Sequence, residues 1–219
     1  MPYKWIAKNQ SDKLIVFFNG WGMDERVIEH MDTSGMDILM FYKYSQSEAF
    51  SLEKIQSYKS RYLVAYSLGV FMACEWLSRH KISFDYSIAI NGTIFPIDHE
   101  KGISEAIYEG THDYLSEESL RKFNRRMFSD RNELERFNLI KSSFTIEQLK
   151  NELNFIKTCY KKQEQWHCLF DKAYIGLQDQ IFLPDRQRKA WEGTHTEEHQ
   201  WSHFPWFKFE SWKAILNKK

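Results

Sequence analysis

The chain has 219 residues, a length typical of one domain with a sizeable hydrophobic core. Its 30 basic and 30 acidic side chains cancel, so no net charge favours nucleic acid or a membrane surface as a partner.

Cysteine usage and the N-terminal residues bear on the cellular compartment. Cys74, Cys159 and Cys168 are odd in number, widely spaced and without a Cys-x-x-Cys pair, which argues against a disulfide framework or a zinc site. The first residues lack the apolar segment of a signal peptide, and no run approaches the ~18 apolar residues of a membrane helix. We therefore expect a cytoplasmic protein with reduced thiols.

The first half of the chain alternates apolar runs with helical patterns. Residues 14–18 are continuously apolar, as expected for a strand covered on both faces of a parallel sheet. Asp24 is a good N-cap for a helix carrying Val27, Ile28 and Met31. The other predicted strands are residues 3–8, 37–42, 61–66 and 85–90, and the other predicted helices are residues 51–55 and 67–80. This alternation predicts a doubly wound α/β fold.

The alternation stops after residue 97. Ser116 is a predicted cap for a helix with an apolar stripe, and Thr145 with Gln148 forms the capping box of a longer helix. No buried strand is predicted between residues 98 and 168. We therefore expect one domain whose core comprises residues 1–97 and 169–219, with residues 98–168 inserted as a helical cap before the last strands.

The sheet resumes in the last fifty residues. Residues 172–176 form a predicted strand, and Pro184 starts a predicted helix that Gly193 follows. Residues 194–200 are polar, so a strand there fits only at the edge of the sheet. A closing helix is predicted to carry Phe209, Trp212 and Ile215.

Residues 65–69, with the sequence Ala-Tyr-Ser-Leu-Gly, join the predicted strand 61–66 to the predicted helix 67–80. A serine on such a tight junction, with small residues two positions away on each side, is the pattern of a nucleophile elbow. Ala65 replaces the usual first glycine and is still small. By itself the pentapeptide also fits an ordinary turn, but its place between strand and helix favours Ser67 as a nucleophile.

A serine nucleophile requires a base and an acid that orients the base. In α/β-hydrolases these follow the serine in the order acid, then histidine. His203, just before the predicted closing helix, is the expected base, and Asp179, just after strand 172–176, is the expected acid. The alternatives are His195 and His199 for the base and Asp98 and Asp185 for the acid.

The reaction also needs donors for the oxyanion of the tetrahedral intermediate. The backbone N–H of Leu68, directly after the serine, is one candidate. The loop after the first long strand usually supplies the second, and here its sequence is Asn-Gly-Trp-Gly at residues 19–22. We expect the Trp21 N–H to be this second donor.

Five motifs together resemble the BioG family of small α/β-hydrolases. They are residues 18–24 (FNGWGMD), 64–69 (VAYSLG), 91–93 (NGT), 176–179 (GLQD) and 203–205 (HFP). The resemblance covers most of the chain and is poorest across the insertion. It implies hydrolysis of the methyl ester of pimeloyl-acyl carrier protein in biotin synthesis, with Ser67, Asp179 and His203 as catalytic residues and with no metal or organic cofactor.

Four cations of the Ser116 helix are spaced to share one broad face: Arg121, Lys122, Arg125 and Arg126. With the resemblance, this face becomes a candidate docking site for acyl carrier protein and for the phosphate of the phosphopantetheine that bears the pimeloyl methyl ester. The alternative is a solvated face that pairs with neighbouring acids.

Other functions share parts of this pattern. A generalist carboxylesterase or thioesterase would have the same triad and ignore the carrier. A non-catalytic module that binds acyl carrier protein would keep the fold, and an acyltransferase would need an alcohol or thiol acceptor. Nucleic acid and membranes are not expected as partners.

Overall fold

A seven-stranded sheet forms the centre of the computed structural model, which describes residues 1–162 and 170–216. The strands are β1 (Tyr3–Ala7), β2 (Lys13–Phe18), β3 (Asp37–Phe41), β4 (Ser60–Tyr66), β5 (Tyr86–Ile90), β6 (Lys172–Gly176) and β7 (His195–His199). Their order is β1-β3-β2-β4-β5-β6-β7, and every pairing is parallel except that of β1 with β3. The predicted α/β fold with a mostly parallel sheet is confirmed.

Burial along the strands follows their position in the sheet. Residues 14–18 of β2 and all of β3 are buried, because helices cover both faces of a parallel sheet. The edge strands β1 and β7 are only partly buried. The polar sequence of β7 is therefore tolerated at an edge, as predicted.

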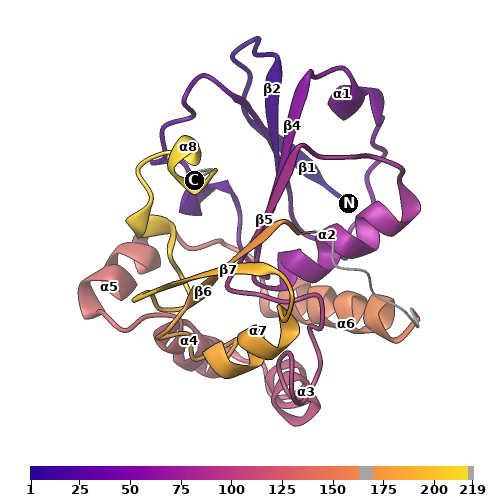
Figure 1. Ribbon diagram of the computed structural model, residues 1–219. Helices are drawn as coiled ribbons and strands as arrows, with labels where there is room; N and C mark the ends of the chain where they lie inside the picture. Colours follow the sequence, from indigo (N-terminus) through magenta and orange to yellow (C-terminus); the bar gives the residue numbers. More distant parts are fainter. Residues whose placement is uncertain (163–169, 217–219) are drawn as a thin grey trace.

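Helices cover the sheet on both faces (Figure 1). One core packs α2 (Leu68–Arg79) and α1 (Glu53–Gln56) against side chains such as Val16 and Leu63, with α7 (Pro184–Ala190) ending beside it at Trp191. The opposite core packs η1 (Glu25–Val27), η2 (Trp206–Lys208) and α8 (Trp212–Ile215) against the other face.

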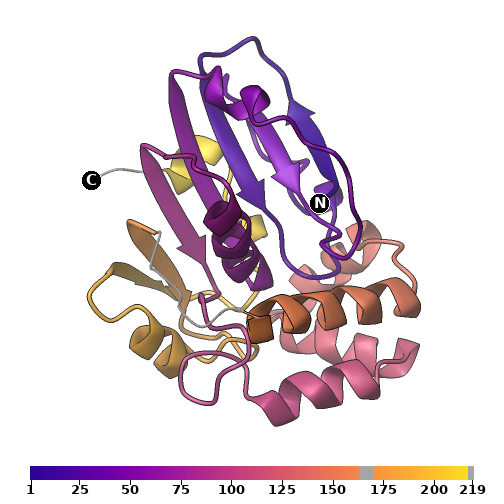
Figure 2. The same cartoon turned by 90° about the vertical axis from the view of Figure 1, so that its right-hand side faces the viewer.

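The described part of the chain between β5 and β6 contains four helices. They are α3 (Glu105–Asp113), α4 (Glu117–Arg126), α5 (Arg131–Ile140) and α6 (Ile146–Lys162). The predicted caps form: Ser116 accepts the Ser119 N–H, and Thr145 and Gln148 exchange hydrogen bonds at the start of α6. Figure 2 shows these helices gathered at one end of the sheet. The end of the predicted insertion, including Cys168, lies outside the described residues.

Two predicted helices are shorter than expected. Asp24 does cap, but it accepts the Arg26 N–H at the start of a single 3₁₀ turn, Glu25–Val27. Val27, Ile28 and Met31 are buried, so the apolar spacing is satisfied without a full helix. The closing segment is likewise divided into η2 and α8. The Ser211 side chain caps the start of α8 by accepting the Ala214 N–H.

Cys74 and Cys159 are buried and form no disulfide. Within residues 1–162 and 170–216, no helix is long and apolar enough to cross a membrane.

Candidate active site

Ser67 sits in a strained backbone conformation between β4 and α2, with φ 55° and ψ −129°. The small residue two positions later is required by packing: a Cβ on Gly69 would lie 2.5 Å from the Phe18 carbonyl oxygen and 2.3 Å from that of Asn19. Ala65, two positions earlier, is fully buried between β2 and β5. The elbow expected from the sequence is thus formed at the end of the central strand.

A chain of hydrogen bonds joins the three residues predicted for the triad. Ser67 Oγ lies 3.0 Å from His203 Nε2, and His203 Nδ1 lies 2.8 Å from Asp179 Oδ2. All three residues are buried, with 6%, 1% and 2% of their surface exposed. A carboxylate only accepts, so Nδ1 donates to Asp179 and leaves Nε2 free to accept the serine proton. This is the geometry that general-base activation of a serine needs.

Asp179 is held rigidly in the loop that follows β6. Its Oδ1 accepts the N–H groups of Ile181 and Phe182 at 2.7 and 2.9 Å. Its Oδ2 accepts the side-chain amide of Gln187, on α7, at 3.2 Å in addition to His203. These donors fix the carboxylate while leaving one oxygen aimed at the imidazole.

His203 is held by a residue that the sequence did not single out for a role. The Asn91 side-chain amide donates to the carbonyl oxygens of Ser202 and His203 at 2.9 and 2.8 Å. Its oxygen accepts the Gly176 N–H at 2.7 Å, at the end of β6. Asn91 is fully buried and has φ 45°, so it links the ends of β5 and β6 to the histidine loop. The signal in the sequence that could have indicated Asn91 is an Asn-Gly pair directly after a buried strand.

The two predicted oxyanion donors border the same space as the serine. Trp21 and Leu68 line a pocket together with Ser67 and His203. Within the described residues, the backbone N–H groups of Trp21 and Leu68 donate no hydrogen bond. Unpaired donors beside a nucleophile can receive an oxyanion.

The pocket beside Ser67 is mostly apolar. It extends from the elbow to the inserted helices, and its apolar lining includes Tyr108, Phe123, Met127, Leu153, Ile181 and Leu183. Ile107 and Leu183, which are 49% and 41% exposed, mark the part that meets solvent. Two cations, Arg126 and Arg186, also border it. Such a pocket suits an extended acyl chain that carries a polar group at its outer end.

The alternative acids and bases lie in other contacts. Asp98 accepts the N–H groups of Glu100 and Lys101 in a turn, and Asp185 pairs with Arg188 on the surface.

The alternative bases also have other surroundings. His199, at the end of β7, stacks on Trp201 with ring centroids 3.9 Å apart. His195 is exposed at the start of the same strand. None of these groups contacts Ser67 in the described part of the chain.

A family model described as "Pimeloyl-ACP methyl esterase BioG" matches residues 1–215. The chain belongs to the BioG family. A selenomethionine crystal structure of BioG from Haemophilus influenzae superimposes with a TM-score of 0.90 at 28% identity, covering 99% of this chain and 100% of that one. An enol-lactonase from Burkholderia xenovorans, at 12% identity, shares the fold alone with a TM-score of 0.61 over 98% of this chain and 92% of the other.

A longer relative also matches. The malonyl-[acyl-carrier protein] O-methyltransferase of Bacteroides fragilis is 39% identical over 178 residues, which is 81% of this chain. The BioG-family chain spans only 36% of that relative's length. The fold of the chain is that of the α/β-hydrolases, as predicted, and this rests on the structural matches.

The basic face predicted on α4 is exposed, but its four cations differ in their contacts. Lys122 pairs with Glu118 at 2.7 Å, one turn earlier. Arg126 lies over the Phe123 ring and borders the pocket. Arg121 and Arg125 form no ion pair in the described residues. Among the described residues, Lys122 is thus the one cation of this face that forms an ion pair with a neighbouring acid.

The acidic residues before α4 are engaged elsewhere. Glu109 and Glu105, on α3, pair with Lys157 and Lys161 of α6 at 2.5 and 3.7 Å. These acids therefore do not neutralise the arginines of α4.

Among the described residues, no cluster of three or more His, Cys, Asp or Glu side chains has the arrangement of a metal site.

Proposed function

We propose that this chain is a serine esterase that hydrolyses the methyl ester of pimeloyl-acyl carrier protein, giving pimeloyl-acyl carrier protein and methanol. The observation that carries the proposal is the buried hydrogen-bond chain Ser67–His203–Asp179 beside an apolar pocket. Membership of the BioG family supports the choice of substrate.

In the first step, His203 Nε2 takes the Ser67 proton as Oγ attacks the ester carbonyl. Asp179 holds the imidazole in the required tautomer and stabilises its positive charge. The negative charge that forms on the carbonyl oxygen is received by the N–H groups of Trp21 and Leu68. Collapse of the intermediate expels methoxide, which leaves as methanol with the proton from His203.

The second step repeats this chemistry with water. His203 takes a proton from water, the hydroxide attacks the acyl-serine, and the proton returns to Ser67 Oγ as the acid is released. No step calls on a metal or an organic cofactor. The free carboxyl product would then enter later steps of biotin assembly.

We further propose that residues 98–168 act as a cap over the site. The pocket that holds Ser67 is bordered by Tyr108 of α3, Phe123 of α4 and Leu153 of α6. The pimeloyl chain would lie against these side chains, with its methyl ester at Ser67 and its thioester toward solvent. Burial of the five methylenes of the pimeloyl chain would give several kcal/mol of binding energy.

Acyl carrier protein would dock on the α4 face. Arg121 and Arg125 are exposed without an ion-pair partner in the described residues, and Arg126 reaches the pocket. Lys122 contributes less because Glu118 already pairs with it. These guanidinium groups can bind the phosphopantetheine phosphate and acidic side chains of the carrier. A substrate on this carrier and the buried thiols of Cys74 and Cys159 fit a cytoplasmic enzyme.

Two measurements test the proposal: the rates of hydrolysis of two esters, and growth of a rescue strain without biotin. Wild-type protein should cleave pimeloyl methyl ester on acyl carrier protein with a far higher kcat/KM than a short p-nitrophenyl ester, and should restore biotin-free growth to cells lacking their own pimeloyl ester esterase. Equal rates on both esters would indicate a generalist esterase. Failure of a fluorophosphonate to label Ser67 would indicate a non-catalytic carrier-binding module, and a requirement for added alcohol or thiol would indicate an acyltransferase.

A further inference from the structure

The loop of residues 19–22 is held from outside by the inserted helices. The Trp21 indole N–H donates to the Leu149 carbonyl oxygen at 2.9 Å, and Ser142 Oγ donates to the Gly22 carbonyl oxygen at 2.6 Å. The packing is tight, because a Cβ on Gly22 would lie 2.6 Å from Leu149 Cδ2. Gly22 also has φ +67°, which favours glycine. The loop that carries the Trp21 amide thus depends on α6 for its position.

A buried carboxylate completes this attachment. Glu152, on α6, is 3% exposed, and its Oε2 accepts the Gly22 N–H at 3.1 Å. Its Oε1 accepts the Tyr44 N–H, just beyond β3, at the same distance. The Tyr44 hydroxyl in turn donates to the Asn19 carbonyl oxygen at 2.5 Å. One side chain therefore fastens the loop both to α6 and to the segment that follows β3.

We propose that Glu152 is a positioning residue for ester hydrolysis: by accepting the Gly22 amide in its charged form, it holds the adjacent Trp21 N–H where the oxyanion develops. This inference rests on the proposed esterase function. Glu152 does not line the pocket beside Ser67, so it acts through the loop and not on the substrate.

The charged form matters because two N–H groups need two good acceptors. An ionised carboxylate accepts on both oxygens, whereas a protonated one turns one oxygen into a hydroxyl donor, which is a poor partner for an N–H. Burial raises the Glu152 pKa to about 7, although the Gly22 and Tyr44 amides and Lys43 stabilise the charged form and oppose the rise.

The two tyrosines that interact with Glu152 stay neutral in this range. They are Tyr44, which follows β3, and Tyr108 of α3, whose pKa values are raised well above the usual value mainly by burial. Lys43 is the cation that acts on Glu152. The loop therefore gains its full set of acceptors as the pH rises through about 7.

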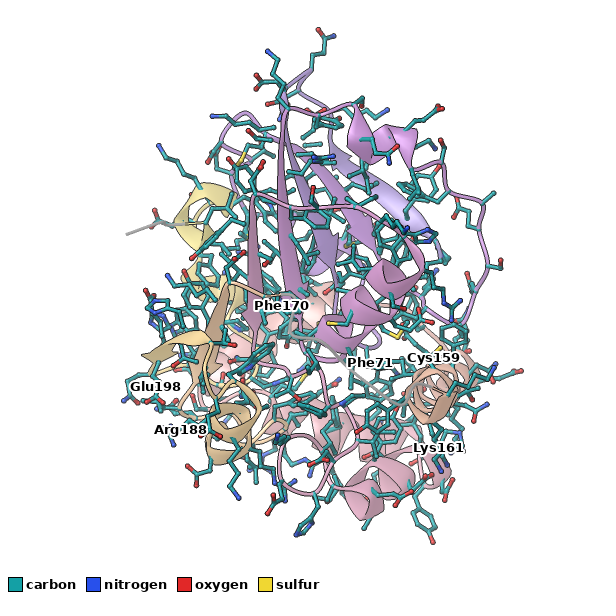
Figure 3. All side chains as sticks on the ribbon, turned by 45° about the vertical axis from the view of Figure 1, so that its right-hand side comes forward. Phe71, Cys159, Lys161, Phe170, Arg188 and Glu198 are labelled. Carbon is teal, nitrogen blue, oxygen red and sulfur yellow. The ribbon has the colours of Figure 1, made fainter. Side chains whose placement is uncertain are left out.

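The test exchanges Glu152 for glutamine and compares it with a matched control. In Glu152→Gln one acceptor oxygen is replaced by an NH₂ group that faces an N–H. We therefore expect kcat on a p-nitrophenyl ester to fall about tenfold, with KM within about twofold of the wild-type value. The fall is smaller than the roughly 100- to 1000-fold that complete loss of an oxyanion donor costs, because the Trp21 N–H is displaced and not removed. Glu75→Gln removes another buried carboxylate that contacts α6, at Cys159, about two turns after Glu152. Phe71 of α2 and Cys159 of α6, both labelled in Figure 3, belong to the same core and mark where these two helices meet. Glu75→Gln should leave kcat unchanged.

A pH profile separates positioning from a merely structural role. The ratio of wild-type kcat to Glu152→Gln kcat should rise about tenfold between pH 5.5 and pH 8.5, with its midpoint near 7. Ser142→Ala, which removes a neutral contact to the same loop, should lower kcat by a factor that does not vary with pH.

A second measurement needs no variant at Glu152. Protein labelled with ¹⁵N-glycine has nine glycine amides, and the Gly22 signal should titrate near pH 7 even when His203→Gln removes the imidazole. A flat Gly22 signal, or a kcat ratio that is constant or near one, would overturn the proposal for Glu152. If wild-type protein neither cleaves esters nor reacts with a fluorophosphonate, the proposed function itself fails, whatever Gly22 does.

Discussion

The two halves of the candidate site are supported by different parts of the molecule. The Ser67–His203–Asp179 half rests on the sheet. Asn91 lies at the end of β5, the amides after Asp179 lie in the loop between β6 and α7, and Gln187 lies on α7. The Trp21 half rests on the inserted helices through Leu149, Ser142 and Glu152.

Because of this difference, the support of the nucleophile and the support of the oxyanion donor can be disturbed separately. A change in the sheet-supported half should stop formation of the acyl-serine. A change in the helix-supported half should slow the reaction while leaving the nucleophile intact. The following predictions test this separation, beginning with the largest expected effect.

Removal of the nucleophile breaks the sheet-supported half completely. Ser67→Ala should lower kcat on pimeloyl methyl ester bound to carrier by roughly 10⁴- to 10⁶-fold, as for other triads, with the circular dichroism spectrum and Tm retained. Growth without biotin should be lost in the same rescue strain. A variant that keeps near full activity would disprove the role of Ser67.

Asp179→Asn should preserve the packing but lower kcat by about 10⁴-fold, because the amide can hold the imidazole in the wrong tautomer. The rate of fluorophosphonate labelling of Ser67 should fall in parallel. The control is Asp185→Asn, which lies on the surface of α7 beside Arg188 and should label at the wild-type rate. Equal labelling of Asp179→Asn and wild type would contradict the assignment.

Asn91 should affect both stability and rate, because it supports His203 from within the core. Asn91→Ala leaves the Gly176 N–H and the two carbonyl oxygens of residues 202 and 203 unpaired, which should lower the free energy of unfolding by about 3 kcal/mol. Urea denaturation gives this value. An unchanged unfolding free energy would mean that water replaces the side chain.

Glu152 should make the helix-supported half dependent on pH. Its pKa in the folded protein, about 7, lies above the usual value of 4.5, so the folded state binds more protons between these limits. The contribution of Glu152 to the free energy of unfolding is therefore fully present below about pH 4.5. As the pH rises to about 7, roughly 3 kcal/mol of this contribution is lost. The difference in unfolding free energy between wild type and Glu152→Gln, measured from pH 4.5 to 8, should show this slope, and a constant difference would refute it.

The docking face should produce the smallest effect, confined to the carrier-borne substrate. Reversing charge in Arg121→Glu/Arg125→Glu should raise KM about tenfold for pimeloyl methyl ester on acyl carrier protein and leave a p-nitrophenyl ester unaffected. Lys13→Glu/Lys59→Glu reverses two exposed charges at the amino ends of β2 and β4, opposite the site. Equal KM changes in the two double variants would exclude specific docking on α4.

The sequence predicted the parts of the molecule that local pattern controls. Continuous apolar runs located β2 and β3, and the order serine, aspartate, histidine along the chain picked out three residues that the fold brings within hydrogen-bonding distance. Capping residues located the starts of α4 and α6.

The supporting residues could not be found in this way. Glu152 meets Gly22 across 130 positions and Asn91 meets His203 across 112, and neither contact leaves a local pattern. The predicted helix after Asp24 was wrong because a 3₁₀ turn at Glu25–Val27, followed by further turns, buries Val27, Ile28 and Met31 without an α-helix.

Trp21 lines the pocket beside Ser67 and also contacts the inserted helices. Its ring meets Phe123 of α4 edge-on, with centroids 5.1 Å apart, its indole is fastened to α6, and its backbone N–H is the expected oxyanion donor. An acyl chain that displaces Phe123 would therefore also shift that amide. We expect discrimination between acyl chains to appear in turnover more than in affinity, with poorly fitting chains bound well but processed slowly.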